Sequence, residues 1–181
     1  MLYARFPRSM NDHDLRLRPL RIFDGPTMSS GLRDEAILKA NGLSEPISSS
    51  WLFVWWLIKK TFLITYCIEC DSRRIGFVGL HGLRLGESTE ISMVLFDSDI
   101  RGLGYGSRVF TLLSQNLKKY SIAEKVIARV KVDNYISLSF VRKLGFVEEG
   151  ICDNIVTLSL HLKSLPFRER KASSTPKFEA Y

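Results

Sequence analysis

Along this chain, hydrophobic residues recur either at every second position or at the spacing of a helix. Each change between the two spacings marks a new element. A period of two is typical of strands, and it predicts them over residues 15–20, 62–68, 75–83, 90–96, 125–132, 146–149 and 155–162. A helical period predicts helices over residues 31–41, 50–60, 104–120 and 135–144. Clustered strands followed by strand–helix alternation indicate an α/β (α+β) fold, with a mixed sheet and helices on both faces.

The ends of the predicted helices have residues that commonly start and stop a helix. Ser30 is a candidate N-cap for the first helix, and Gly145 follows the last one where glycine is favoured. Residues 1–14 are irregular and polar, and residues 164–181 are rich in proline, serine and charge. We therefore expect a flexible N-terminus, one domain over residues 15–163 and a C-terminal tail.

The composition permits a full core and suggests an anionic partner. Of the 181 residues, 45% are apolar, which is enough for one globular domain. The net charge is +7, and five of the cations lie in residues 163–177. A basic chain attracts nucleic acid, an acidic protein or a phosphorylated cofactor, so charge alone does not choose among them.

The cysteines argue against a disulfide-stabilised protein and against a zinc-binding protein. Cys67, Cys70 and Cys152 give no disulfide framework. Cys67 and Cys70 form a C-x-x-C without the second pair that a zinc site needs, and on a strand they point to opposite faces. We therefore expect reduced thiols and no metal site.

Residues 51–68 form the one segment that could be taken for a membrane span. Lys59 and Lys60 interrupt it near its middle, which is costly in a bilayer, so we expect a buried helix followed by a buried strand. The N-terminus lacks the apolar stretch of a secretory signal, and a cytoplasmic protein with no membrane partner is expected. The segment also places three tryptophans on one helix face, either in the core or around a substrate pocket: Trp51, Trp55 and Trp56.

A glycine-rich turn between a predicted strand and a predicted helix is the most informative segment. Alternate glycines let successive backbone N–H groups approach a ligand closely, and the positive end of the helix dipole lies at the same place. A pyrophosphate is the expected guest. No Gly-Lys-Ser/Thr follows and G-x-G-x-x-G is absent, which excludes a Walker A loop and a dinucleotide fingerprint. The turn comprises Arg101, Gly102, Leu103, Gly104, Tyr105, Gly106 and Ser107.

Arg101-x-x-Gly104-x-Gly106 resembles the Q/R-x-x-G-x-G/A loop by which members of the GNAT acetyltransferase superfamily hold the pyrophosphate of coenzyme A. The flanking segments extend the resemblance. Residues 90–95 are similar to the splayed fourth strand of that superfamily, whose backbone pairs with pantetheine. Residues 132–150 resemble its second cofactor-side signature, V-x-N-x-x-(A/S)…(E/R)-K-x-G-F-x-x-E-G, and look most like the branch that acetylates N-termini of ribosomal proteins.

The resemblance implies an N-acetyltransferase with a mostly antiparallel sheet of about 6–7 strands. Acetyl-CoA is then the cosubstrate, and a primary amine, on a protein N-terminus or a small molecule, attacks it directly in a ternary complex. A backbone N–H near Val94 or Leu95 would polarise the thioester carbonyl. The other implied cofactor contacts, besides the loop, are Met93, Asn134, Ser137, Phe140 and Lys143, with Arg142 as a further cation for the 3′-phosphate.

The resemblance also suggests how the leaving thiolate gains its proton. Phe140 stands where many members of the superfamily have a tyrosine, and it has no hydroxyl. Ser137 occupies the position of a serine that the ribosomal-protein branch uses for this role, so Ser137 is the predicted donor. Ser139 and Tyr135 are weaker options, and a serine in a first helical turn also serves as a plain capping or solvent-facing residue.

The base that accepts the amine proton is predicted to be Glu90, at the start of the fourth strand. An exposed carboxylate at a strand end is the alternative interpretation. The ribosomal-protein branch has a glutamate in a longer connection before the last strand, and here that connection is only residues 151–154. Asp153 and His81 are the remaining candidates.

Two other functions compete with acetyl transfer. The missing tyrosine and the short final hairpin favour a catalytically impaired GNAT-fold module that binds acyl-CoA or regulates. The high pI of 9.5 favours a nucleic-acid-binding domain, but the chain lacks the aromatic–basic pattern and the DNA-reading motifs of that class. The sequence leaves the acceptor and the choice between monomer and homodimer open.

Overall fold

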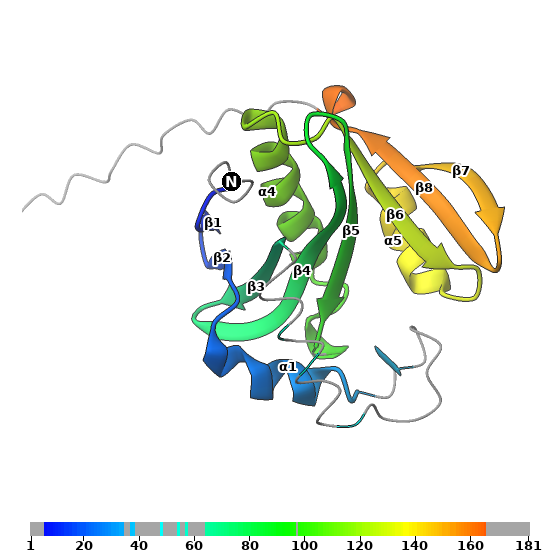
Figure 1. The fold of residues 1–181 in the computed structure, drawn as a ribbon. Coiled ribbons are helices and arrows are strands. Elements are labelled where there is room, and N and C mark those ends of the chain that lie inside the picture. Colours follow the sequence, from blue (N-terminus) through cyan, green and yellow to red (C-terminus); the bar gives the residue numbers. More distant parts are fainter. Residues whose placement is uncertain are drawn as a thin grey trace, which may run out of the picture.

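The computed structural model describes residues 6–34, 37, 38, 48, 54, 57, 64–96 and 98–165. One eight-stranded sheet runs through them in the order β1-β2-β3-β4-β5-β6-β8-β7 (Figure 1). All neighbouring strands are antiparallel except β5 and β6. The strands are β1 (Met10–Asp12), β2 (Leu15–Pro19), β3 (Ile64–Cys70), β4 (Arg73–Arg84), β5 (Ser88–Leu95), β6 (Lys125–Lys131), β7 (Val147–Cys152) and β8 (Ile155–His161).

This sheet confirms the mixed, mostly antiparallel architecture expected from the sequence. The sequence predicted no strand before residue 15, whereas the structure has β1 pairing with β2. A strand of three residues is too short to show a period of two, so its pairing is visible only in the tertiary structure. The turn between β7 and β8 is Asp153-Asn154 with φ of 48° and 62°, which is typical of a two-residue hairpin.

Helices cover both faces of the sheet. They are α1 (Gly25–Gly31), α4 (Tyr105–Lys119) and α5 (Tyr135–Lys143), with short 3-10 turns η2 (Ile22–Asp24), η3 (Ser98–Ile100) and η4 (Leu162–Ser164). The side chains of α4 and α5 enter the main core on one face. On the other face, Met28 of α1 packs with Leu20, Cys67 and Phe77.

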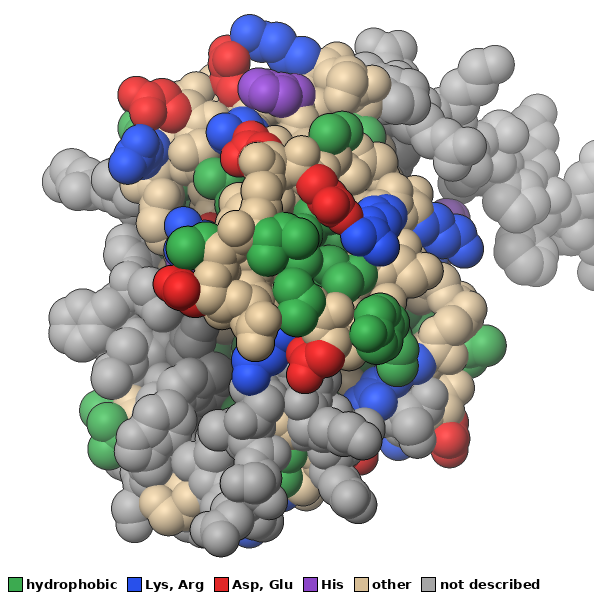
Figure 2. Space-filling view, turned by 90° about the vertical axis from the view of Figure 1, so that its right-hand side faces the viewer, with side chains coloured by type: hydrophobic (Ala, Val, Ile, Leu, Met, Phe, Trp, Pro, Cys, Tyr) green, Lys and Arg blue, Asp and Glu red, His purple; other side chains and the backbone are tan. Residues whose placement is uncertain are grey.

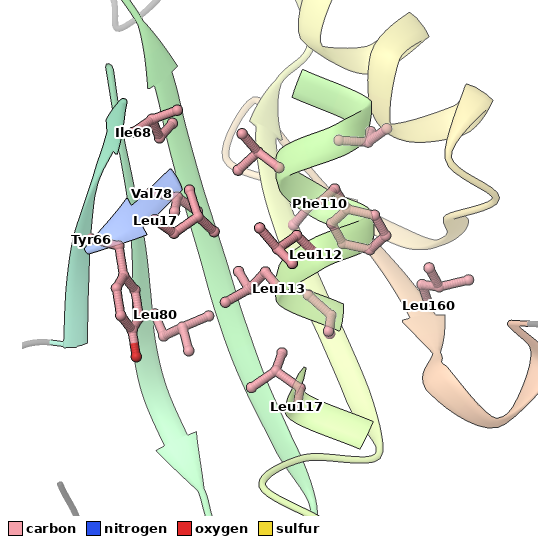
Figure 3. Close-up of a cluster of buried hydrophobic side chains, with 14 of the residues drawn as sticks. Leu17, Tyr66, Ile68, Val78, Leu80, Phe110, Leu112, Leu113, Leu117 and Leu160 are labelled. Atoms are coloured by element: carbon pink, nitrogen blue, oxygen red, sulfur yellow. The ribbon is translucent and has the colours of Figure 1, made fainter. Parts of the chain in front are cut away.

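The main core lies between α4 and the strands (Figure 3). Val109, Phe110, Leu113 and Leu117 are buried as the sequence predicted, and Leu112 joins them. Burying a side chain of this size stabilises the fold by about 1.5–3 kcal/mol. Tyr120 was expected on the same face, but it is the C-cap residue after the last helical turn and is 41% exposed.

Helix α5 buries a different face from the one that its sequence suggested. Ile136, Phe140 and Leu144 recur at steps of four, yet Ile136 is 82% exposed, and Leu138 and Val141 are the buried residues. Phe140 and Leu144 lie at the margin of the core. The helix rests on the sheet at an angle that turns the Leu138 side inward, and a one-dimensional pattern does not contain that angle.

Helix α1 precedes the first helix that the sequence predicted, over residues 31–41. Helix α1 has Pro26 in its first turn, where proline is favoured, and it ends at Gly31, where the sequence placed the start. Ser30 is therefore inside α1 and is not an N-cap. Asp34 takes that role, since its Oδ1 accepts a hydrogen bond from the Ile37 N–H at 3.1 Å. The remainder of residues 31–41, and most of the predicted helix 50–60 with its three tryptophans, lie outside the described residues.

Cys67 and Cys70 both lie on β3 and point to opposite faces, as predicted. Burial raises the pKa of the Cys67 thiol to about 12, so this thiol is inert at neutral pH. All three cysteines are free. Among the described residues, no helix combines the length and the apolar character that crossing a bilayer requires.

The side of the molecule formed by β7, β8 and α5 exposes hydrophobic side chains (Figure 2). Every residue of β7 is exposed, and its one partner strand is β8. Val147 and Ile151 are 69% and 65% exposed, and Tyr135 and Ile136 at the start of α5 are more exposed still. Strand β7 is therefore an open edge of the sheet in the described part of the chain.

A buried ion pair fixes α1 against the sheet. Arg18 and Asp24 are 2% and 0% exposed, and the guanidinium donates to both carboxylate oxygens at 2.7 and 2.8 Å. Arg18 also donates to Glu69 at 2.8 Å, and the Arg21 N–H donates to Asp24 at 2.6 Å. A buried charge pair of this kind is sensitive to the loss of either partner.

We predict that Asp24→Asn lowers the free energy of unfolding by about 3–5 kcal/mol, because it removes the buried carboxylate that binds the Arg18 guanidinium through both oxygens and leaves that guanidinium with Glu69 alone. Urea unfolding at neutral pH measures the change. Asp71→Asn, at an exposed turn, is the matched control and should change stability by less than about 0.5 kcal/mol. Equal stability of Asp24→Asn and the parent protein would contradict the prediction.

Lowering the pH should reduce the difference in unfolding free energy between the parent protein and Asp24→Asn. Burial acts to raise the pKa of Asp24, but the hydrogen bonds from Arg18 and the Arg21 N–H outweigh it and hold the pKa below its usual value. A lowered folded-state pKa contributes stability that is present above the unfolded pKa, near 3.9, and is lost as pH falls through the folded pKa.

Candidate active site

The candidate site is a cleft that opens where β5 and β6 separate. The two strands pair in parallel over only three residues, Ser88 to Glu90 opposite Lys125 to Ile127. Beyond Glu90, β5 continues along β4 and β6 continues along β8. Figure 1 shows the two strands diverging below this short contact.

The free edge of β5 faces this cleft. The Phe96 N–H donates to the Ile75 carbonyl of β4 at 2.9 Å, and backbone groups alternate sides along a strand. The N–H and C=O groups of Met93 and Leu95 therefore point toward β6, which is too far away to pair with them. An extended amide ligand can pair with such an edge.

The cleft has a volume of about 360 Å³. Side chains of β5, β6 and α5 form its walls, and Phe110 of α4 forms part of its floor. Residues from four elements that are distant in sequence thus enclose one cavity, which is large enough for the narrow arm of an organic cofactor. The lining residues that the sequence had selected are Glu90, Met93, Val94, Asn134, Ser137 and Phe140.

The glycine-rich turn lies between the end of β5 and the start of α4. Gly102 and Gly104 have φ of +82° and +87°, which few other residues adopt. Gly104 is the N-cap of α4, and no side chain caps that end. The first N–H groups of the helix, on Tyr105, Gly106 and Ser107, thus keep their donor capacity for an anion.

Arg101 lies beside this turn, but its head group contacts protein. Its Nη2 donates to the Leu95 carbonyl at 3.2 Å and lies 3.6 Å from Asp34 Oδ1. The guanidinium is a third exposed. Arg101 therefore fixes the end of β5 and keeps further donors for a phosphate.

Tyr105 contributes backbone to the turn, and its side chain points elsewhere. The Tyr105 hydroxyl accepts a hydrogen bond from the Cys70 thiol at 3.4 Å. One turn later, the Arg108 guanidinium donates to Asp14 at 2.6 Å and to the Asp12 carbonyl at 2.8 Å. These contacts tie the first turn of α4 to β3 and to the β1–β2 hairpin.

The start of α5 forms the opposite wall. Asn134 is the N-cap, and its Oδ1 accepts from the Ser137 N–H at 3.1 Å, so the capping role considered for Asn134 is present. Ser137 lines the cleft, and its hydroxyl has no hydrogen-bond partner among the described residues. Leu103, by contrast, is 68% exposed outside the cleft.

Phe140 packs against the backbone of the glycine-rich turn. A Cβ atom on Gly106 would lie 3.1 Å from the Phe140 ring carbon Cζ and 3.6 Å from Met93 Cε. Glycine at position 106 thus permits α4, α5 and β5 to meet at the closed end of the cleft. In a tyrosine at position 140, the hydroxyl would be bonded to Cζ and would point at Gly106. The space at this position therefore suits phenylalanine.

Glu90 stands where the strands separate and faces a cation. Its Oε2 lies 3.2 Å from Arg129 Nη1 on β6. Arg129 and Ser92 also line the cleft, and the sequence analysis selected neither of them for the site. Both lie on the same sheet face as Glu90, but that grouping depends on which strands are neighbours.

The remaining candidates lie outside the cleft lining. Lys143 and Ser139 are exposed on α5, and Asp153 is exposed in the β7–β8 turn. Tyr135 is 76% exposed. Arg142 donates from Nε to Glu148 of β7 at 2.9 Å, so it forms a surface ion pair with that strand.

Comparisons with known proteins agree with this geometry. The model of the acetyltransferase (GNAT) family matches residues 34–146, and no curated protein sequence matches the chain. The fold is similar to the Salmonella typhimurium acetyl transferase that modifies the N-terminal serine of ribosomal protein L7/L12, with TM-score 0.71, 16% identity and coverage of 84% of this chain and 98% of that one.

Two further solved structures share the fold. A GNAT-family acetyltransferase from Bacillus anthracis has TM-score 0.72 and 14% identity, and covers 86% of this chain and 99% of its own. The microcin self-immunity acetyltransferase MccE, solved with acetyl-CoA and AMP, has TM-score 0.67 and 14% identity, and covers 83% of this chain and 93% of its own. At these identities the likeness shows the fold alone.

The chain belongs to the GNAT family of acetyltransferases. It is accordingly an acetyl-CoA-dependent acyltransferase, with acetyl-CoA as its cosubstrate. The observed residues fit that molecule, because a free strand edge borders the cleft and the first turn of α4 meets the cleft-lining residues Phe140 and Met93 at Gly106.

We predict that Gly106→Ala weakens acetyl-CoA binding about tenfold, or 1.4 kcal/mol, because the new methyl group displaces the Phe140 ring toward the cleft. Alanine also favours the helix more than glycine does, so thermal stability should stay equal or rise. Calorimetry and thermal unfolding measure the two effects. Gly150→Ala on β7, where a Cβ meets nothing within 4 Å, is the control and should bind as the parent does. Unchanged binding by Gly106→Ala would contradict the packing argument.

Proposed function

We propose that this chain transfers the acetyl group of acetyl-CoA to a primary amine, and that the amine attacks directly while both substrates occupy the cleft between β5 and β6. The observation that carries this proposal is that two binding features adjoin and outline one path. The edge of β5 at Met93 borders the cleft, and the first turn of α4 meets the cleft-lining residues Met93 and Phe140 at Gly106. A pantetheine arm and a pyrophosphate require these two features in this order.

Each part of the path suits one part of acetyl-CoA. The N–H groups at the start of α4 would hold the pyrophosphate, with Arg101 beside them. The edge of β5 would pair with pantetheine amides, and a cleft-facing N–H of Met93 or Leu95 would polarise the thioester carbonyl. Backbone alternation favours these two residues over Val94, whose N–H faces β4.

The acceptor is an amine on a protein N-terminus or on a small molecule. One similar structure is described as modifying an N-terminal serine, and another was solved with acetyl-CoA and AMP. Neither is close enough in sequence to fix the acceptor of this chain. Glu90 and Arg129 at the cleft place one acidic and one basic group where an acceptor would enter.

Two side chains have proposed roles in the chemistry. Ser137 would give a proton or a hydrogen bond to the leaving thiolate, since its hydroxyl lines the cleft without a protein partner among the described residues. Glu90 would receive the amine, and it is the sequence-based candidate for the base. Its carboxylate forms an ion pair with Arg129 at 3.2 Å, so a second cation can approach it from the cleft.

A catalytically impaired module that binds acetyl-CoA is the second candidate function. It is favoured by one observation, the phenylalanine at position 140, whose ring closes the cleft against Gly106 without offering a hydroxyl. In that case binding persists without turnover. The two following experiments separate binding from transfer.

Titration of acetyl-CoA into the purified protein by calorimetry tests the binding step. We expect micromolar affinity, and we expect Gly104→Glu to abolish it, because a carboxylate at the N-cap repels the phosphates. Glycine at 104 has φ of +87°, so the substitution also strains the backbone. Gly86→Glu is the matched control, since Gly86 has φ of +81° and open space in the β4–β5 turn. Absence of binding by the folded parent protein, or equal loss in both variants, would overturn the proposed site.

Substitution of Ser137 tests the transfer step. Ser137→Ala should lower kcat by roughly 10- to 100-fold with the Kd for acetyl-CoA unchanged, because the hydroxyl acts only on the leaving group. Thiol release with a panel of amines measures the rate, using a peptide with N-terminal serine, spermidine, an aminoglycoside and glucosamine. Ser139→Ala, on the exposed side of α5, should match the parent. Parent-like turnover by Ser137→Ala would remove Ser137 from the mechanism.

A further inference from the structure

A small polar hollow lies on the sheet face opposite α4, beside the cleft. Paired residues on neighbouring strands share a face, and so do residues two apart on one strand. Thr65 pairs with Gly79, Gly79 with Ser92, and His81 with Glu90. All five residues therefore lie on one face, while Val78 and Leu80 between them belong to the core under α4.

Gly79 makes this hollow possible. A Cβ atom at position 79 would lie 3.3 Å from His81 Nε2, 3.3 Å from Ser92 Oγ and 3.4 Å from Thr65 Oγ1. Three polar atoms thus converge on the space that a side chain would fill. Any residue other than glycine would crowd them at distances tighter than ordinary contacts.

Two of the three polar groups are joined, and the third is not. His81 Nε2 lies 2.6 Å from Ser92 Oγ. Thr65 is 7% exposed, and its Oγ1 is buried with no hydrogen-bond partner in the described part of the chain. A buried hydroxyl left unpaired costs about 1–3 kcal/mol, so this arrangement favours a polar ligand in the hollow.

Ser92 connects the hollow to the cleft. It is one of the cleft-lining residues, together with Met93 and Val94 on its own strand and Ser137 on the opposite wall. The Ser92 hydroxyl therefore has the cleft on one side and His81 on the other. Ser92 directly precedes Met93, whose backbone N–H faces the cleft. The thioester is proposed to lie beside that N–H.

We propose that the amine proton leaves through Ser92 to His81, with Ser92 as the catalytic residue that touches the amine and His81 acting through it. This inference rests on the proposed acetyl transfer and specifies its proton path. As the nitrogen–carbon bond forms, the amine gives a proton to Ser92 Oγ, and Ser92 gives its own proton to His81 Nε2. As the carbon–sulfur bond breaks, the thiolate takes a proton from Ser137, and solvent restores both groups after product release.

Among the described residues, the charged groups beside His81 are Glu90 on β5 and Arg129 on β6. Glu90 is the direct cross-strand neighbour of His81, and Arg129 pairs with that carboxylate at 3.2 Å. On β3, the described residue of this face nearest in register is Thr65, which pairs with Gly79 and does not titrate. Glu90 stabilises the imidazolium that the relay forms, and Arg129 moderates this effect. Glu90 thus faces the incoming acceptor, the ammonium form gives its first proton to solvent before attack, and His81 holds the second proton, which leaves during attack.

The test is the pH dependence of kcat, measured by thiol release at saturating acetyl-CoA with the four amines named above and with hydroxylamine as a small general acceptor. A histidine base must be neutral, so kcat should fall on the acid side as His81 becomes protonated. His81→Gln should remove this acid limb and lower kcat by roughly 10²- to 10⁴-fold. The Kd for acetyl-CoA should stay at the parent value in the same variant.

Ser92 and Gly79 provide independent arms of the test. Ser92→Ala should reproduce the His81→Gln profile, and Ser92→Thr should recover it because the hydroxyl is retained. Gly79→Ala should lower kcat by filling the hollow, while thermal unfolding shows that the variant is folded. His161→Gln, the same substitution at an exposed histidine of β8, is the control and should keep the parent profile.

The outcomes separate this inference from the proposed function. An acid limb that persists in His81→Gln, or that only Glu90→Gln removes, overturns the relay and leaves acetyl transfer standing. A protein that binds acetyl-CoA but transfers to none of the five acceptors counts against both. Loss of the limb in His81→Gln and Ser92→Ala, with its return in Ser92→Thr, supports the relay, because a structural role for either residue would not move a pH profile.

Discussion

The short parallel contact between β5 and β6 is the constraint on which the rest of the site depends. Three residue pairs hold the two strands together, and each strand then follows its antiparallel partner, β4 or β8. Backbone hydrogen bonds are strong and seldom left unmade, so a free edge inside a sheet normally closes. Here the divergence leaves the edge of β5 open over Met93 and Leu95, above a floor that α4 provides. Cofactor binding is the use that this geometry supports.

The end of the cleft depends on how firmly the first turn of α4 is held. Arg108 joins that turn to Asp14 and to the β1–β2 hairpin, and the hydrogen bonds from Arg108 hold the pKa of Asp14 well below its usual range. Tyr105 contacts Cys70 on β3. A helix start that binds an anion must keep its N–H groups aimed in one direction, and these contacts use side chains, so the N–H groups stay available.

The two faces of the sheet have separate tasks. The face under α4 is apolar and supplies most of the core. The other face has Thr65, His81, Ser92 and Glu90 in one group around Gly79. Since β5 separates from β6 at Glu90, both faces meet at the cleft, and residues of the polar face reach a ligand that lies along the strand edge. The proposed proton path through Ser92 thus lies on strand positions that alternate with those of the main core.

The sequence by itself determined the strand and helix periods, the glycine-rich turn and the position of Ser137, because these depend on spacing within short segments. The same local signals placed Val109 to Leu117 in the core, and they identified the family through residues 101–150. They placed Ser30 at a helix start although it lies inside α1, gave the wrong buried face for α5, and missed α1 and β1. Only the tertiary structure brought Ser92 to His81 and Arg129 to Glu90, because the order of strands in the sheet sets these contacts. Strand order depends on long-range pairing, which no local pattern records.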